Sequence, residues 1–591
     1  MDKQNFLKIS FFVLSGMILG GCFNSSQANQ GGEKGDRRKP NVILIMTDDQ
    51  GYGDLSCHDN PILKTPNIDR LHDESVRMTD FHVSPLCTPT RAALMTGRYP
   101  ARTGAYITSS GRTMMHTDEK TIANLFADNG YITGMFGKWH LGDNAPHRPY
   151  EHGFQDVVWH RCGGIGQVSD YWGNDYFDDT YDRNGKFEKF EGYCTDIWFS
   201  EAMQFIEKNQ EKPFFLYLAT NVPHSPYRAG DEWVAPYQES ADWKAGPEFY
   251  GMIANFDHNL GVFRKRLETL GLSENTIFVF MTDNGTARGA SFDKKGYIVK
   301  GFNAGMRGKK GSQYDGGHRV PFFIHWPSGG LNAGVEINKL AAHIDVLPTL
   351  AELSGISVPE SYDLDGISFA SLLKNPDAPG QRDHLFVQLH GGLGFYKKPE
   401  PFYNSTILTE RWRLMDGSRL YDIKADPGQQ VDVASEHPEV VAELRKLYMP
   451  WWESVSPRMT PVRIDLGNLN DNPTFLCSQD WYLPTGNPPW NFGQIRKLPR
   501  VTGPWMVNVK KTGRYRLTLR QYPKLANKPV EKTVRAKVEI AGLSKEVKVE
   551  PGSKGIIIEM DLPAGETELV TYLYNEKGQA GGAYFTEVEL F

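Results

Sequence analysis

Several short apolar runs along the chain have the length and the content of β-branched and aromatic residues that are typical of strands. The runs cover residues 41–47, 132–136, 214–219 and 276–282. They are continuously apolar rather than alternating, which indicates strands buried on both faces and hence a largely parallel sheet covered by helices. Helical patterns fall between them, for example over residues 121–126 and 250–270. The chain therefore predicts an α/β fold with a large mixed, mostly parallel β-sheet between layers of helices.

Each of these runs stops at a cluster of polar residues. Asp48 and Asp49 follow the first run, and Asp283 and Asn284 follow the last. Because the carboxyl ends of parallel strands meet at one edge of a sheet, we expect these side chains to gather there. They offer only oxygen ligands, which suits calcium or magnesium and not zinc. Acidic pairs after strands also serve as helix caps or solvated turns, but two such sets after buried strands favour a metal site.

The pattern changes twice towards the C-terminus. Strand-like segments at 405–408 and 412–415, a turn-rich stretch at 422–428 and a helical pattern from about 438 to 448 indicate a small α+β subdomain. Alternating segments at 515–519, 534–540 and 555–560, separated by Gly and Pro turns, indicate an antiparallel β-sandwich. We therefore predict a catalytic domain over residues 39–380, the subdomain over 381–460 and a β-rich accessory domain over 461–591.

The N-terminal segment has the pattern of an export signal. Lys3 and Lys8 precede an apolar stretch, residues 11–19, that is too short to span a bilayer as a permanent helix. The stretch ends in Leu-Gly-Gly-Cys at Cys22, which resembles the bacterial lipobox, where the cysteine receives lipid. The alternative is an ordinary signal with a chance cysteine. We predict a lipoprotein signal peptide over residues 1–22, a flexible polar tether over 23–38, and an exported bacterial lipoprotein in the periplasm or at the outer membrane or cell surface.

The charge of the chain limits its binding partners, and its cysteine count limits the disulfides it can form. The chain of 591 residues has a formal charge of −6 and no long run of like charge, so neither nucleic acid nor a polybasic membrane surface is indicated. Beyond Cys22 the cysteines are Cys57, Cys87, Cys162, Cys194 and Cys477, an odd number that cannot all pair with one another. Cys162 and Cys194 could form a disulfide, which spacing alone cannot establish. At least one cysteine has another role.

Cys87 lies in the segment 85–98, which reads PLCTPTRAALMTGR. Pro89 suits the first turn of a helix and would put Cys87 near its N-terminus, where anions are favoured, with Arg91 on the same face. The segment resembles the signature of the type I, formylglycine-dependent sulfatases of the alkaline phosphatase superfamily, in which C-x-P-x-R directs oxidation of the cysteine to formylglycine. The competing interpretation is a buried structural cysteine, which the continuation through TGR makes improbable.

Further segments resemble other sulfatase motifs. Residues 130–140 (GYITGMFGKWH) are similar to the second signature, although Phe136 stands where a smaller residue is commoner, and residues 310–321 (KGSQYDGGHRVP) are similar to the late lysine motif. The sequence NVPH ends at a further histidine. The resemblance implies that the catalytic residues are Cys87, Arg91, Lys138, His140, His224 and Lys310, with Lys309 a near competitor of the last. It implies one Ca²⁺ ion held by Asp48, Asp49, Asp283, Asn284 and residue 87.

The resemblance spans roughly residues 39 to 460 and implies a bacterial exported carbohydrate sulfatase or arylsulfatase with an alkaline-phosphatase-like fold. In the implied reaction one hydroxyl of the hydrated formylglycine at position 87, lowered in pKa by calcium and held by Arg91, attacks sulfur, while Lys138 steadies the sulfate. His224 beside Lys310 protonates the leaving oxygen, and His140 takes a proton to expel sulfate. The implied partners are a formylglycine-generating or sulfatase-maturing enzyme and a sulfated carbohydrate.

Two alternatives remain, the second from another functional class. One is a phosphonate or phosphate ester hydrolase of the same superfamily, and the other is a catalytically dead, lipid-anchored protein that binds glycans through its sandwich. For the preferred substrate, a sulfated polysaccharide or its oligosaccharides, we expect contacts from the long aromatic and charged segment 159–182. The residues proposed there are His160, Arg161, Asp170, Tyr171 and Trp172. A loop packed only on itself is the other interpretation of that segment.

Overall fold

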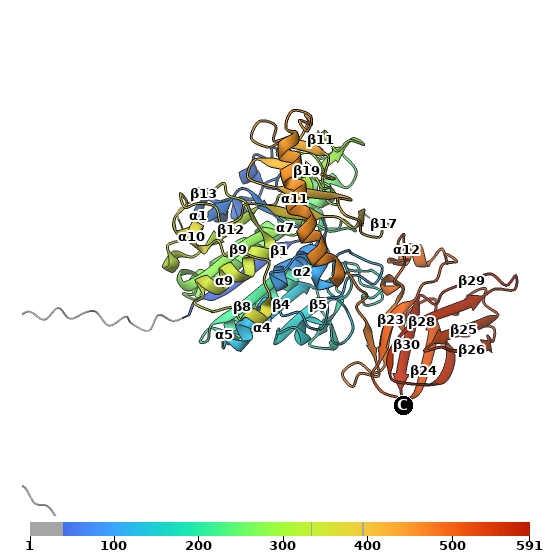
Figure 1. Ribbon diagram of the computed structural model, residues 1–591. Helices are drawn as coiled ribbons and strands as arrows, with labels where there is room; N and C mark the ends of the chain where they lie inside the picture. The colour runs from blue at the N-terminus through green and yellow to red at the C-terminus, as the bar shows by residue number, and fades with distance from the viewer. Residues whose placement is uncertain (1–38, 333, 393–394) are drawn as a thin grey trace, which may run out of the picture. The chain divides into compact units, whose positions relative to one another are not determined.

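A ten-stranded mixed sheet forms the centre of the computed structural model, which describes residues 39–332, 334–392 and 395–591. In order across the sheet the strands are β13 (Glu336–Ile337), β2 (Val76–Met78), β12 (Phe322–His325), β9 (Thr276–Thr282), β1 (Asn41–Thr47), β8 (Phe214–Ala219), β4 (Ile132–Lys138), β5 (Asp156–His160), β6 (Thr180–Arg183) and β7 (Lys186–Lys189). The five strands from β9 to β5 are parallel and lie side by side in Figure 1. The predicted α/β fold with a mixed sheet is confirmed, and its antiparallel margins, β12 on one side and β6 and β7 on the other, were not foreseen.

The central strands are buried on both faces because helices cover each side. Val42, Leu44 and Met46 of β1 pack with helices α2 (Cys87–Thr96), α4 (Ile122–Asp128), α9 (Val346–Leu353) and α10 (Ala370–Lys374). Ile43 and Ile45 of the same strand pack with α1 (Pro66–Glu74), α5 (Cys194–Asn209) and α7 (Gly246–Thr269). The alternate side chains of one strand thus enter two cores, as its continuous apolar run requires.

A four-stranded antiparallel sheet and a long helix form the small α+β part. The sheet has the order β15 (Leu385–Gln388), β18 (Ser405–Leu408), β19 (Trp412–Met415) and β20 (Arg419–Asp422). The helix, α11 (Pro438–Val455), continues past the predicted end near residue 448 and contains Pro450. It continues because Tyr448, Trp451 and Val455 pack into the apolar cluster shared with the sheet.

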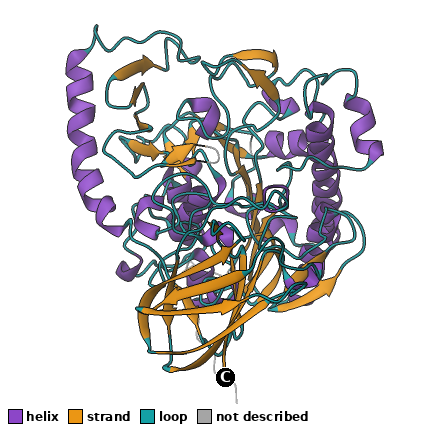
Figure 2. Ribbon diagram, turned by 90° about the vertical axis from the view of Figure 1, so that its right-hand side faces the viewer, coloured by secondary structure: helices purple, strands orange, loops and turns teal. Residues whose placement is uncertain are grey.

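The C-terminal part is a two-layer sandwich of strands, seen around the chain end in Figure 2. One sheet contains β21 (Ile464–Leu466), β23 (Trp505–Val509), β28 (Gly565–Tyr574), β25 (Arg535–Ile540) and β26 (Leu543–Lys548), with β29 (Ala580–Gly581) beside β28. The other contains β22 (Thr474–Cys477), β30 (Phe585–Leu590), β24 (Gly513–Arg520) and β27 (Ile556–Leu562). The predicted antiparallel sandwich is present, with one parallel pair, β21 and β23.

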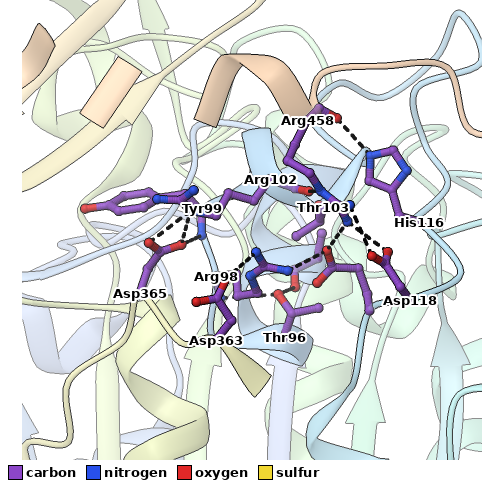
Figure 3. A network of polar contacts seen from close by, with 12 residues as sticks. Thr96, Arg98, Tyr99, Arg102, Thr103, His116, Asp118, Asp363, Asp365 and Arg458 are labelled. Carbon is purple, nitrogen blue, oxygen red and sulfur yellow. Dashed lines mark hydrogen bonds and ion pairs between the residues drawn. The ribbon is translucent and has the colours of Figure 1, made fainter. Parts of the chain in front are cut away.

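A network of ion pairs fixes the end of α2 (Figure 3). Gly97 caps this helix with a left-handed φ of 67°, and Arg98, the last residue of the 85–98 segment, bonds Glu119 at 2.8 Å and Asp363 at 2.9 Å. Beside it Arg102 bonds Asp365, and Arg458 bonds Asp118. The arginine that ends the segment therefore holds the helix of Cys87 in place.

The proposed disulfide between Cys162 and Cys194 is not formed, and both residues are free thiols. Cys162 packs in the cluster of the C-terminal sandwich, with its Sγ 2.5 Å from the Gln479 side-chain oxygen. Cys194 begins α5 in a different core, where Asn221 donates to its Sγ at 3.6 Å. The signal peptide, tether and Cys22 lie outside the described residues. Within residues 39–591 as described, no helix is long and apolar enough to cross a membrane.

Candidate active site

The predicted polar residues meet at the carboxyl edge of the parallel strands. Thr47, the last residue of β1, is in register with Thr282, the last residue of β9, so the acidic pairs that follow them are neighbours. The backbone N–H of Asp49 donates to Asp283 Oδ1 at 2.9 Å, which ties the two loops together. Asp49 has a φ of 73°, in the left-handed region that costs a non-glycine residue about 1 kcal/mol or more. Such strain is typical of functional positions.

Three buried carboxylates are each matched by one cation. Lys138 Nζ lies 2.6 Å from Asp48 Oδ2, and Arg91 Nη2 lies 2.9 Å from Asp283 Oδ2. Lys310 Nζ contacts both carboxylate oxygens of Asp49, at 2.6 and 2.7 Å. Lys309, the competitor in sequence, instead lies with its Nζ 5.6 Å from the centre of the Phe292 ring. When all three carboxylates are ionised, the three pairs leave the cluster without net charge.

The oxygen atoms of this cluster fit a hard cation. One ligand atom each of Asp48, Asp49 and Cys87 lies within 4.8 Å of the others. Asp48 Oδ1 and Asn284 Oδ1 are buried without a hydrogen-bond partner in the described part of the chain. Burial, and to a smaller extent repulsion from the neighbouring Asp48, raise the pKa of Asp283. A divalent ion here would relieve that repulsion and partner the orphaned oxygens.

Cys87 is the first residue of α2 and is 2% exposed. Burial raises the pKa of its thiol, so the unmodified side chain is a poor nucleophile at neutral pH. One turn further, Arg91 donates to the carbonyl of Lys138 at 2.9 Å, which joins α2 to the end of β4. The predicted position at a helix N-terminus, with Arg91 on the same side, is what the structure shows.

Two histidines face the same space. His140 is buried, has a left-handed φ of 58°, and neither ring nitrogen has a partner within the described chain. His224 donates a hydrogen bond from its Nδ1 to the backbone oxygen of Ser225 at 2.6 Å. Its Nε2 remains free and lies 3.9 Å from Asp49 Oδ2. Burial lowers the pKa of both rings, to about 3 in His224, with Lys310 adding to the effect there. Both are therefore neutral at pH 7, and each presents an available nitrogen.

A pocket of about 250 Å³ opens above these groups. Cys87, His140, His224 and Lys310 line it, together with Leu86, Thr108, Ser109, Gly163, Gln167, Gln479, Asn487 and Trp490. The last three come from beyond residue 461, in the C-terminal part, and the sequence reasoning missed them. The run of Pro, Trp and Asn at 487–491 was the available signal, since aromatic loops between strands often carry function.

The segment 159–182 was expected to contact sugar, and it divides into two groups. Gln167 lines the pocket, and Trp172 lines a neighbouring cavity. Arg161 pairs with Asp182 at 2.9 Å, and Tyr171 packs against Phe187. His160 and Asp170 are buried and bonded to the loop itself. The interpretation as a loop packed on itself therefore describes most of the five residues, and Trp172 is the exception.

Two family models match the chain: one described as Sulfatase over residues 40–356, and one described as N-sulphoglucosamine sulphohydrolase, C-terminal, over residues 308–449. The chain belongs to the sulfatase family. This sulfatase is 31% identical to human arylsulfatase A over 468 residues, which cover 70% of the chain and 87% of the relative. It is 30% identical to the N-acetylgalactosamine-6-O-sulfatase of Bacteroides thetaiotaomicron, covering 75% of the chain and 97% of the relative.

Among solved structures, the sulfatase is similar to Ps i-CgsB in complex with k-i-k-neocarrahexaose. The TM-score is 0.62 at 30% identity, and the match covers 72% of this chain and 94% of that one. The predicted recognition and the predicted enzyme class, a sulfuric ester hydrolase, are confirmed. All the residues predicted for catalysis and metal binding lie within residues 40–356, whereas Gln479, Asn487 and Trp490 of the sulfatase lie beyond both matched regions.

Proposed function

We propose that this sulfatase removes sulfate ester groups from a sulfated polysaccharide or its oligosaccharides, with formylglycine at position 87 and one Ca²⁺ ion. The pocket carries the proposal: Cys87, which lies beside the oxygen cluster, lines it together with two histidines and a lysine. Several relatives have names that refer to sugar substrates, among them the N-acetylgalactosamine-6-O-sulfatase and the ulvan-active sulfatase of Formosa agariphila. Both are 30% identical to this chain.

The residues present fit both groups that the family uses. Asp48, Asp49, Asp283 and Asn284 would hold calcium, which would supply positive charge next to position 87. Formylglycine would supply, in its hydrated form, an oxygen nucleophile in place of the thiol. We propose that Arg91 and Lys138 hold the charged groups around that position, as their contacts with Asp283 and Asp48 support.

The proton transfers follow from the charge state of the pocket residues. Lys310 stays protonated because Asp49 raises its pKa despite its burial. We propose that it lies beside the leaving oxygen with His224, whose free Nε2 gains a proton when an anionic sulfate ester binds nearby. His140 is neutral and unpartnered, so it can accept a proton at the end of the cycle.

Release of inorganic sulfate tests the proposal. The substrate panel contains N-acetylgalactosamine 6-sulfate, glucosamine 2-N,6-O-disulfate, and oligosaccharides of carrageenan and ulvan, with phosphate esters assayed in parallel. We expect sulfate release from at least one sugar, its loss in the Cys87→Ala variant, and mass-spectrometric conversion of residue 87 when a maturing enzyme is coexpressed. Faster turnover of phosphate esters would indicate the phosphate or phosphonate hydrolase instead, and binding of sugars without turnover would indicate the dead glycan-binding protein.

We also propose export and lipid attachment at Cys22, which rest on the N-terminal sequence alone. A Cys22→Ser variant expressed in a bacterial host should move from the membrane fraction to the soluble fraction. Equal membrane association of the variant and the parent would contradict the anchor.

A further inference from the structure

A second cavity adjoins the active-site pocket. It has a volume of about 710 Å³, and Gln167 and Trp490 line both spaces. The catalytic part contributes Trp172 and Arg228 to its wall, and the C-terminal part contributes the segment 490–496. A ligand that leaves the catalytic pocket past Trp490 therefore enters this cavity.

The segment from the C-terminal part is held against the catalytic part by backbone bonds. Val168 N–H donates to Trp490 O at 3.3 Å, and Gln167 and Asn491 form an antiparallel bridge. Nearer the pocket, Ser109 Oγ donates to Asn487 Oδ1 at 2.5 Å. These contacts make the segment a fixed wall of the cavity, which lowers the entropic cost of binding a ligand there.

The chemistry of the wall suits a sugar ring. Trp172 packs edge-on against Phe492 with ring centroids 4.5 Å apart, and Trp490 stands where the two cavities meet. Aromatic rings give a sugar a broad apolar contact surface, and Ser225 adds a polar group that can bond a hydroxyl. An apolar floor with a few polar groups is the usual composition of a small-molecule site.

The charge of the wall is positive. Arg228 pairs with Asp175 at 2.7 Å, whereas Arg496 is exposed and has no ion-pair partner in the described part of the chain. Lys528 adds a further cation with its Nζ 6.0 Å from the centre of the Trp172 ring. An arginine fork without a partner at the rim of a cavity is suited to a carboxylate or a sulfate group.

We propose that this cavity is a subsite for the neighbouring sugar of the substrate, and that Arg496 binds an acidic group on that sugar. The C-terminal sandwich is then a specificity element of the active site. The inference rests on the proposed function, since it assumes that the sulfated sugar occupies the first pocket. It predicts a preference for chains of two or more units over single sulfated sugars.

The test compares Arg496→Ala and Trp172→Ala with Lys497→Ala, a control that removes an exposed cation next in sequence which lines neither cavity. Each variant is assayed on the oligosaccharide of the panel that the parent cleaves fastest and on the corresponding sulfated monosaccharide. We expect Arg496→Ala to lower kcat/KM on the acidic oligosaccharide about tenfold more than on the monosaccharide, the value of one charged hydrogen bond. Lys497→Ala should resemble the parent on both.

Oligosaccharides whose second unit is neutral, carboxylated or sulfated identify the group that Arg496 binds. Only on substrates that carry this group should Arg496→Ala show the additional loss of kcat/KM. Equal losses on both substrate lengths, or faster cleavage of monosaccharides by the parent, would overturn the subsite. If the parent releases no sulfate at all, the proposed function has failed separately. Calorimetry of oligosaccharide binding to the Cys87→Ala protein then still decides whether Arg496→Ala weakens binding.

Discussion

Replacing Lys138 by methionine would test the charge arrangement of the site. Lys138 Nζ and Asp48 Oδ2 are 2.6 Å apart, and both side chains are fully buried. The substitution keeps most of the side-chain volume and removes the charge. The next cation, Arg91, lies 4.0 Å from Asp48 and is already bonded to Asp283. Asp48 would therefore be left as a buried carboxylate without its own partner.

The cost of breaking such a pair from one side is about 3–5 kcal/mol. The unfolding entropy is about 2 cal/mol/K per residue, so the Tm of a cooperative unit of about 550 residues falls by roughly 1 °C for each kcal/mol of stability lost. We therefore expect Lys138→Met to lower Tm by about 3–5 °C in the presence of a chelator. Calcium should restore more stability to the variant than to the parent, because the ion supplies the charge that Asp48 has lost.

Differential scanning calorimetry in chelator and in calcium measures both effects. The double variant Asp48→Asn with Lys138→Met is the control: it should recover most of the loss in chelator, because neither charge remains, and should gain less from calcium. A Tm loss of the same size in chelator and in calcium would refute the assignment of Asp48 as a metal ligand. No loss in chelator would refute the reasoning about the buried pair.

Three further changes give distinct outcomes. In Gly163→Ala the new Cβ would lie 2.5 Å from His140 Cε1, so the ring must move, and we expect kcat to fall about tenfold or more with Tm little changed; unchanged kcat would contradict a role for His140. Because Cys87 is buried, a maturing enzyme should convert the unfolded chain and leave the folded chain unmodified, as mass spectrometry would show, and equal conversion of both would contradict this order. Burial raises the pKa of Asp170 to about 8 in the folded protein, so its stability contribution is complete below about pH 4 and is lost as the pH rises through 8. Asp170→Asn should thus gain up to about 1.4 kcal/mol per pH unit over the parent in this window, measured by urea unfolding, and a constant difference would refute the shift.

Of the five parallel central strands, β1, β8 and β9 were predicted to the residue, β4 was predicted two residues too short, and β5 was not predicted. β1, β8 and β9 are local runs of six or seven residues, buried throughout, and polar residues follow each of them. β7 gave no such signal, because all four of its residues are exposed. The end of α11 was placed too early, since Pro450 normally stops a helix and only tertiary packing of the following turn overrides it.

The residues of the site could be predicted from the sequence, but the ion pairs between them could not. Motif order and the rule that parallel strands end at one edge brought Asp49, Lys310 and His224 together. The partner of each carboxylate depends on side-chain geometry, which the spacing of residues along the sequence does not determine. Trp490 could not be predicted as a pocket residue for another reason. It is some 400 residues from Cys87, and its place in the pocket depends on how the sandwich packs against the catalytic part.

The matched charges of the site lead to a last prediction about how an anion binds. Asp48, Asp49 and Asp283 contact Lys138, Lys310 and Arg91 one to one, and His140 and His224 are neutral, so the residues in contact offer a sulfate ester no net positive charge. A calcium ion held by the carboxylates would provide it. Calorimetry should therefore find that sulfate binds the Cys87→Ala protein at least tenfold more tightly in calcium than in chelator, about 1.4 kcal/mol. Equal affinity in both would mean that the lysines leave their carboxylates to bind the anion, and the metal would then serve the nucleophile alone.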